Sequence, residues 1–219
     1  MLNAWLDCNG GDCSLALSLD LRRAALVLDA GSAIDMLAAL KARDGRPQLY
    51  VRLSPLDSDR VDAELDAILP LAPDGVVLAA CRGGADVQRL GVKLAVREAL
   101  HDLPAGSTRI VAMVAARALL GLSSYVGCSP RLHALGWDAD ALAADLGVRN
   151  RDASPLRSAR DWVLIAARAA GVAALDATLD GLPGLRAETQ RARDDGFSGK
   201  FARTVAEAEA IAAAFGATG

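Results

Sequence analysis

The sequence predicts an α/β protein in which eight parallel strands and their helices form a (β/α)₈ barrel, the TIM barrel. Short apolar segments alternate with longer amphipathic segments about eight times along the 219 residues. Such alternation indicates a parallel sheet, because a crossover helix has to connect consecutive parallel strands. Eight units with strands buried on both faces fit a barrel, although periodicity alone would also permit an open, doubly wound sheet.

The expected strands are short apolar runs. The first, residues 2–6, is the weakest, and the helix-like segment 13–23 separates it from the stronger run ALVLD. The later runs QLYVRL, GVVL and RIVAMV contain the aliphatic side chains of buried parallel strands. The eight expected strands are residues 2–6, 25–29, 48–53, 75–78, 109–114, 132–136, 172–175 and 198–201.

The segments between these strands have the apolar spacing of helices. Val87, Leu90 and Leu94 lie on one stripe, and Ser32 suits the N-cap of the helix that follows the second strand. A further helix is expected to begin near Ala141. The other expected helices are residues 34–43, 59–69, 86–100, 155–170, 185–195 and 205–215.

The chain is expected to form a single domain over residues 1–219, because its length supports one large core and no linker divides it. This length is near the lower end for a TIM barrel, so some helices or loops are expected to be trimmed. No G-x-G-x-x-G motif follows a strand, so dinucleotide binding has no support.

Charge and hydropathy exclude several classes of protein. The 24 basic and 27 acidic residues are spread along the chain, and no basic block suggests binding to nucleic acid or to an anionic membrane. The first 30 residues do not have the pattern of a signal peptide, and no apolar stretch approaches the ~20 residues of a membrane span. We therefore expect a cytoplasmic protein with reduced cysteines.

In a barrel of this kind the functional residues lie at the carboxyl ends of the strands. Arg52 lies between Val51 and Leu53, so its side chain points opposite to theirs. A cation inside the barrel mouth needs an anion, and a guanidinium suits a carboxylate or phosphate. The sequence thus predicts a substrate-binding Arg52; the alternative is a structural ion pair with Asp29 or another nearby acid.

Other candidates come from the same strand ends. Asp29 ends the second strand, where an Asp often caps the following turn. Asp138 and Asp140 follow the sixth strand and suit a hard cation; alternatively, they cap the next helix. Arg82 precedes a Gly pair that could present backbone N–H groups to an anion, or that simply forms the turn into a helix.

Four motifs, in this order and at these separations, resemble one known family. They are YVRLSPLDS at 50–58, PDGVVL at 73–78, LAADLG at 142–147 and GFSGK at 196–200. The chain resembles citrate lyase beta-subunit-like proteins of the HpcH/HpaI aldolase/citrate lyase superfamily. The resemblance implies a TIM barrel, a homo-oligomer (trimer or hexamer), and cleavage of a carbon–carbon bond in a CoA thioester or 2-oxo acid. It also implies a Mg²⁺ ion, which stabilises the developing enolate.

Several site positions differ from that family. Its D-L-E-D-A motif matches residues 29–33, which read DAGSA, so Asp29 is retained as a catalytic candidate and the Glu–Asp pair is lost. Its strand-three arginine is retained as Arg52. Its P-K motif matches Ala79 and Ala80, which lack the lysine.

The metal-binding positions differ as well. The family's strand-five glutamate falls at Ala115–Ala116, and its G-A-E-D aspartate falls at Ala141, directly after Asp140. The I-H-P run is Arg203-Thr204-Val205 here. The resemblance therefore makes Mg²⁺ doubtful and leaves Asp140 as a second catalytic candidate. Asp138 and Asp140 are the remaining metal-ligand candidates, with Arg52 and Arg82 as substrate-binding ones.

Two functions remain open from the sequence. The first is a divergent lyase that acts on a small-molecule anion or an acyl-CoA thioester. The alternative is a catalytically inactive homologue that acts as a binding or scaffold subunit. The retained framework and Arg52 favour the first, and the missing carboxylates favour the second.

Overall fold

A computed structural model of the chain describes residues 3–8, 24–31, 33–41, 46–178 and 182–216. Its eight parallel strands form a closed barrel in which each strand pairs with the next. Strand β1 (Ala4–Asp7) pairs with both β2 (Ala24–Asp29) and β8 (Gly199–Ala202), which closes the sheet. The predicted TIM barrel is confirmed, and the open-sheet alternative is wrong.

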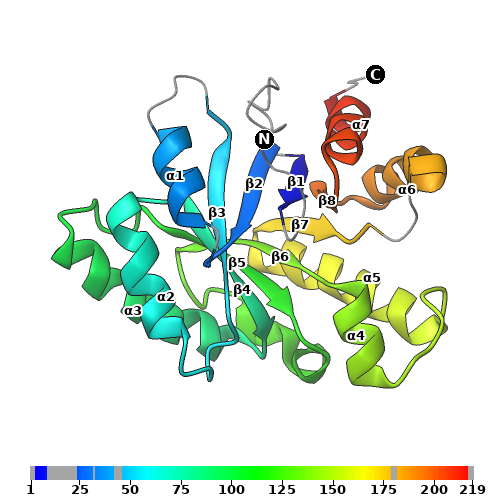
Figure 1. Cartoon of the computed structure of the whole chain (residues 1–219). Helices are drawn as coiled ribbons and strands as arrows, with labels where there is room; N and C mark the ends of the chain where they lie inside the picture. The colour runs from blue at the N-terminus through cyan, green and yellow to red at the C-terminus, as the bar shows by residue number, and fades with distance from the viewer. Residues whose placement is uncertain (1–2, 9–23, 32, 42–45, 179–181, 217–219) are drawn as a thin grey trace.

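Helices surround this barrel (Figure 1). The other strands are β3 (Gln48–Leu53), β4 (Gly75–Cys81), β5 (Arg109–Val114), β6 (Leu132–Gly136) and β7 (Ala173–Asp176). The α-helices are α1 (Ala33–Lys41), α2 (Val61–Ile68), α3 (Gly84–Leu100), α4 (Ala139–Leu146), α5 (Ser154–Ala170), α6 (Leu182–Asp195) and α7 (Val205–Gly216). Two 3₁₀ segments, η2 (Leu69–Leu71) and η3 (Ala116–Tyr125), complete the described elements.

The structure differs from the sequence-based expectation at the end of the first strand and in the segment after β5. The first strand extends to Asp7, one residue beyond the expected end, which places a carboxylate at the barrel mouth. The stretch after β5, whose sequence reads like the start of an α-helix, forms the 3₁₀ segment η3, interrupted at Gly121. The helix-like segment 13–23 lies outside the described residues.

Side chains alternate between the barrel interior and the layer under the helices. Tyr50 packs inside the barrel with Trp5 and Phe201, whereas Val51 and Leu53 pack in the outer layer. Because strand side chains alternate, Arg52 shares the inward face of Tyr50. The predicted orientation of Arg52, opposite to Val51 and Leu53, is confirmed.

Two further expectations concern helices and thiols. Across the described residues, no helix has the length and apolar character that crossing a membrane requires. Cys81 and Cys128 are free thiols, as expected. Cys8 is disulfide-bonded, so the expectation of reduced cysteines is wrong for that residue.

Candidate functional site

Two cavities open at the carboxyl ends of the strands, and Arg52 lines both. The small cavity, about 140 Å³, lies over the ends of β1, β5 and β8 and beside the segments that follow β6 and β7. The large cavity, about 370 Å³, lies over the ends of β2, β3 and β4. Arg52 therefore stands at the boundary between two spaces that could each accept part of a ligand.

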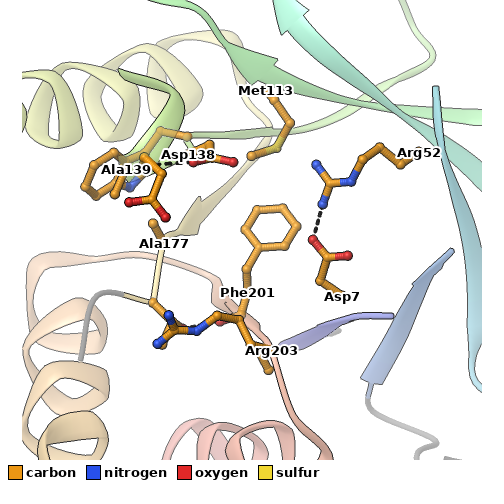
Figure 2. A pocket seen from close by; sticks show the side chains of 12 residues that line it. Asp7, Arg52, Met113, Asp138, Ala139, Ala177, Phe201 and Arg203 are labelled. Carbon is orange, nitrogen blue, oxygen red and sulfur yellow. Dashed lines mark hydrogen bonds and ion pairs between the residues drawn. The ribbon is translucent and has the colours of Figure 1, made fainter. Parts of the chain in front are cut away.

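Arg52 is held by two acidic neighbours. Its Nη2 forms an ion pair with Oδ2 of Asp7 (Figure 2), and its Nε lies 3.9 Å from Oδ1 of Asp29. This Nε is buried and forms no hydrogen bond to any described residue. Because the Arg52 side chain lines both cavities, the exposed part of its guanidinium could accept an anionic ligand. The ion-pair interpretation and the anion-binding interpretation of Arg52 are thus compatible.

The two predicted catalytic carboxylates lie in different cavities. Asp29 lines the large cavity, and its side chain is 48% exposed. Asp140 lines the small cavity, is 70% exposed, and forms an ion pair with Arg151. The structure brings Asp29 to Arg52 and does not bring Asp29 and Asp140 into one cavity.

The predicted metal candidates are engaged in local interactions. Oδ1 of Asp138 accepts the backbone N–H groups of Asp140 and Ala141 at 2.9 and 3.0 Å, which caps α4. The described residues include no group of three His, Cys, Asp or Glu side chains that could hold a metal ion. Mg²⁺ usually keeps several water ligands and is bound by only one or two protein carboxylates, so Asp138 and Asp140 stay predicted metal ligands.

Arg82 lies apart from both cavities. Its guanidinium forms ion pairs with Asp57 at 2.9 Å and Asp86 at 3.2 Å. Gly83 has φ +148° in the turn between β4 and α3, a conformation that suits glycine. The local structure is therefore that of a βα turn, and a substrate-binding role for Arg82 stays a prediction.

Two small residues, Gly31 and Ala79, line the large cavity at positions where the related family has larger side chains. A Cβ added at Gly31 would meet no atom within 4 Å. Gly31 and Ala79 fall in the two stretches where the chain departs from the D-L-E-D-A and P-K motifs. The departure from the family pattern thus coincides with open space beside Arg52 and Asp29.

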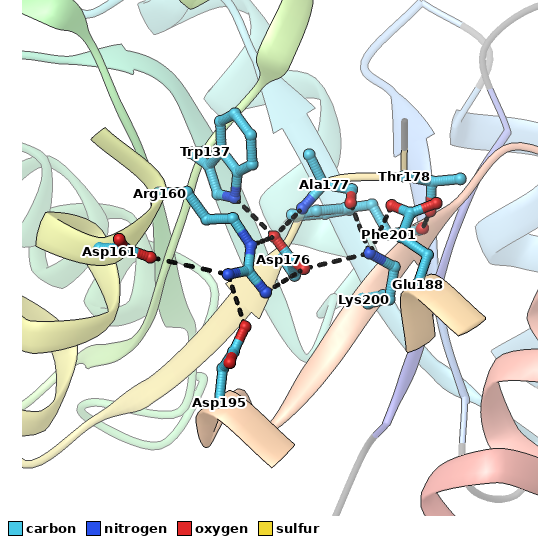
Figure 3. A network of polar contacts seen from close by, with 10 residues as sticks. All are labelled: Trp137, Arg160, Asp161, Asp176, Ala177, Thr178, Glu188, Asp195, Lys200 and Phe201. Atoms are coloured by element: carbon cyan, nitrogen blue, oxygen red, sulfur yellow. Dashed lines mark hydrogen bonds and ion pairs between the residues drawn. The ribbon is translucent and has the colours of Figure 1, made fainter. Parts of the chain in front are cut away.

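The wall of the small cavity rests on a buried polar network. Trp137, which lines the cavity, donates its Nε1–H to Asp176 Oδ1 at 2.9 Å. Asp176 also accepts hydrogen bonds from Arg160 at 3.1 Å and from Nζ of the fully buried Lys200 at 3.1 Å (Figure 3). This network links β6, β7, β8 and α5, and it fixes the Trp137 ring behind the cavity.

Sequence reasoning missed two charged residues of the site. Asp7 lies one residue past the expected end of the weakest strand, and its pairing with Arg52 joins positions 45 residues apart. Arg203 follows β8 and lines the small cavity. The signal for Arg203 was present, because a charged residue replaces the isoleucine of the I-H-P run.

The sequence of the chain matches one known protein family. A family model described as HpcH/HpaI aldolase/citrate lyase matches residues 25–204. A (3S)-malyl-CoA thioesterase of Cereibacter sphaeroides is 29% identical over 169 residues, 75% of this chain and 55% of the relative. The citrate lyase subunit beta of Leuconostoc mesenteroides subsp. cremoris is 28% identical over 192 residues, 84% of this chain and 64% of the relative. The chain thus spans only 55% and 64% of the length of these curated relatives.

A solved structure shares the fold. It is the citrate lyase beta subunit of Mycobacterium tuberculosis complexed with oxaloacetate and magnesium, at a TM-score of 0.73 and 21% identity. The match covers 98% of this chain and 96% of that one. Magnesium and a 2-oxo dicarboxylate are therefore bound by a protein of the same architecture.

Proposed function

The chain belongs to the HpcH/HpaI aldolase/citrate lyase family, and we propose that it is a lyase that breaks a carbon–carbon bond in an anionic acyl-CoA thioester or 2-oxo acid. Support comes from the family match over most of the chain, from a relative named citrate lyase subunit beta, and from a relative named (3S)-malyl-CoA thioesterase, which acts on an acyl-CoA thioester of the same class. The cavity position at the carboxyl ends of the strands is where TIM-barrel enzymes act.

The observation that carries the proposal is the position of Arg52, whose side chain is 18% exposed and lines both cavities. The two cavities have volumes of about 140 and 370 Å³. A carboxylate or thioester oxygen in either space would accept a charge-assisted hydrogen bond. The interaction strengthens as negative charge develops on that oxygen, which is how a cation lowers a barrier.

The proposed step uses Asp29 as the base. Asp29 is partly exposed in the large cavity and lies 3.9 Å from Arg52. With a 3-hydroxyacyl thioester, Asp29 takes the hydroxyl proton, the adjacent carbon–carbon bond breaks, and its electron pair passes to the thioester as an enolate. The enolate oxygen is stabilised by Arg52, and a proton returns to its carbon, which releases an aldehyde or 2-oxo acid and a shorter thioester.

Partners and location are part of the same proposal. CoA fits as the carrier of the acyl group, because a relative is named for a CoA thioester. Mg²⁺ belongs to the related solved structure and has no assigned role in this step. We place the chain in the cytoplasm. We also propose a homo-oligomer, a trimer or hexamer, whose mass light scattering coupled to size-exclusion chromatography would measure.

Turnover of citramalyl-, malyl- and citryl-CoA tests the proposal. We expect malyl-CoA, at least, to be cleaved, and Arg52→Met to lower kcat/KM by roughly 10²-fold or more, as removal of a single oxyanion donor does. Arg89→Met is the control, because Arg89 is 59% exposed, pairs with Asp86 on α3 and lines neither cavity.

The inactive alternative predicts a different result. Neither curated relative favours it, and the chain retains an open cavity at Arg52. Binding of a thioester to the wild-type chain without any turnover, with and without Mg²⁺, would reject the lyase and support the binding role.

A further inference from the structure

The large cavity combines the two residues of the proposed step with several small, uncharged ones. Arg52 and Asp29, to which that step assigns the cation and the base, both line it. Ala30, Gly31 and Ala79 line the same cavity, and none of these three has a charged or hydrogen-bonding side chain. The volume is about 370 Å³, whereas a cavity of ~150 Å³ already holds one molecule of benzene. The cavity therefore has room for a substituent of several carbons beside the reacting atoms.

Each of these three residues is smaller than the one that the related family carries at its position. Against the D-L-E-D-A motif, Ala30 stands in place of leucine and Gly31 in place of glutamate. Against the P-K motif, Ala79 stands in place of proline. The two motifs lie at the ends of different strands, β2 and β4, yet the reductions in size meet in one cavity. This cavity thus lacks one charge and several side-chain carbons of the family pattern.

Neither the backbone nor a close neighbour requires glycine at position 31. A Cβ added there would meet no atom of the described residues within 4 Å, and Gly31 is not among the glycines with positive φ. Gly75 shows the opposite case, because a Cβ added there would lie 2.3 Å from the Tyr50 ring. Gly31 therefore contributes open volume to the cavity.

The proposed step indicates which part of a substrate would occupy this volume. Asp29 takes the proton of the hydroxyl group on C3 of the thioester, so the other groups on C3 lie beside Asp29 in the complex. Gly31 is two residues further along the chain and lines the same cavity. A substituent on C3 that extends toward Gly31 would meet no charged or hydrogen-bonding side chain at positions 30, 31 and 79. An apolar substituent suits this space, because it leaves water without requiring a hydrogen-bond partner.

We propose that the large cavity holds a branched alkyl group on C3 of the substrate, so that the protein cleaves a 3-carboxy-3-hydroxyacyl-CoA thioester and releases a branched 2-oxo acid. The inference rests on the proposed lyase function and on Asp29 as its base. The hydroxyl proton passes to Asp29, the C2–C3 bond breaks, and its electron pair forms the enolate of acetyl-CoA. The enolate takes up a proton at C2, and C3 becomes the carbonyl carbon of the 2-oxo acid. No oxidant, reductant or further reactant is consumed.

Two thioesters test the inference: malyl-CoA, and its analogue with an isopropyl group in place of the hydrogen on C3. Mass spectrometry follows 3-methyl-2-oxobutanoate and acetyl-CoA released from the analogue. We expect the wild-type chain to favour the analogue in kcat/KM by about 10-fold or more, because one methylene group in an apolar pocket is worth roughly 10–200-fold. Gly31→Leu fills the space, so it should lower the ratio of the two kcat/KM values by about 10-fold or more. Ala30→Leu, which installs the family's residue, should lower the ratio in the same direction.

Gly121→Leu is the matched control. A Cβ added at Gly121 would also meet no atom of the described residues within 4 Å, and Gly121 lines neither cavity. The ratio should therefore stay at the wild-type value. Because the ratio compares two substrates on the same protein, it is independent of the fraction of a variant that is folded.

The outcomes separate this inference from the proposed function. If malyl-CoA is cleaved and the analogue has no higher kcat/KM, the branched-alkyl subsite is wrong and the lyase function stands. The same holds if Gly31→Leu and Ala30→Leu both leave the ratio at the wild-type value. If neither thioester is cleaved, the lyase function fails and the subsite fails with it.

Discussion

Lys200 is a fully buried cation that joins two acids behind the candidate site. Its Nζ donates to Asp176 at 3.1 Å, to Glu188 at 2.8 Å and to the carbonyl oxygen of Ala177 at 2.6 Å. Lys200→Met leaves two buried carboxylates without this cation. We expect a loss of roughly 3–5 kcal/mol in the free energy of unfolding, measured by urea denaturation.

The matched control is an exposed lysine. Lys93 pairs with Asp62 at 2.7 Å on the surface of α3 and α2, where solvent screens the attraction. Lys93→Met should change the free energy of unfolding by less than ~1 kcal/mol. Similar losses for Lys93→Met and Lys200→Met would show that the buried network contributes nothing beyond a surface ion pair.

Glu98 makes stability depend on pH. Burial alone would raise the pKa of Glu98, but hydrogen bonds from Arg131 and from the backbone N–H groups of Thr108 and Gly106 outweigh it. They lower the pKa from 4.5 to about 2. The ionised form is favoured by folding, so this stabilisation is present above pH 4.5 and is lost as the pH falls toward 2.

Glu98→Gln tests that linkage. The shift in pKa corresponds to about 3 kcal/mol. Between pH 4.5 and 2, the free energy of unfolding of the wild-type chain should therefore fall by about 3 kcal/mol more than that of Glu98→Gln. Urea denaturation across this pH range measures both proteins. Parallel pH profiles for the two would contradict the assigned role of Glu98.

At the scale of elements, Gly84 sets how closely α3 approaches η3. A Cβ added at Gly84 would lie 1.9 Å from the carbonyl oxygen of Ser124 and 2.9 Å from Cβ of Cys128. Gly84→Ala must therefore push the end of η3 away from α3. We expect the free energy of unfolding to fall by roughly 1–3 kcal/mol, measured by urea denaturation.

Gly91 in the same helix serves as the control. An added Cβ there would meet atoms no closer than 3.7 Å, so alanine fits. Gly91→Ala should raise the free energy of unfolding by about 0.5–1 kcal/mol, because alanine restricts the unfolded chain and favours helix. A destabilised Gly91→Ala, or an unchanged Gly84→Ala, would refute this account of the α3–η3 contact.

The elements could be predicted where a local pattern determines them. The strands around Val51 and Val77 are short aliphatic runs, and the stripe of Val87, Leu90 and Leu94 specifies α3. The 3₁₀ form of η3 could not be predicted, because its sequence reads like the start of a helix. Its geometry depends on the packing of Tyr125 and Ser124 against β4 and α3.

At the scale of the molecule, closure of the barrel brings together parts of the site that no local pattern links. Arg52 could be predicted, since an arginine on an apolar strand is unusual. The ion pair with Asp7 exists because β1 completes the ring between β2 and β8. Arg203 enters the same cavity from the end of β8, and only the closed barrel shows that it faces the ligand space shared with Arg52.

The sequence alone does not decide whether Asp138 and Asp140 bind a metal ion or cap a helix. Their spacing after a strand suits a cation, and the sequence allowed helix capping as the alternative. In the structure Asp138 caps α4 and Asp140 turns toward Arg151. The choice between capping and coordination depends on which other acids lie near, and that is a property of the whole barrel.

The products formed from (3S)-malyl-CoA test the central claim most directly. Mass spectrometry of the reaction with wild-type chain and with Arg52→Met distinguishes cleavage of the carbon–carbon bond from cleavage of the thioester. The account predicts glyoxylate and acetyl-CoA in equal amounts from the wild-type chain, and at least ~10²-fold slower release from Arg52→Met. Malate and free CoA as the only products, or equal rates for the two proteins, would contradict it.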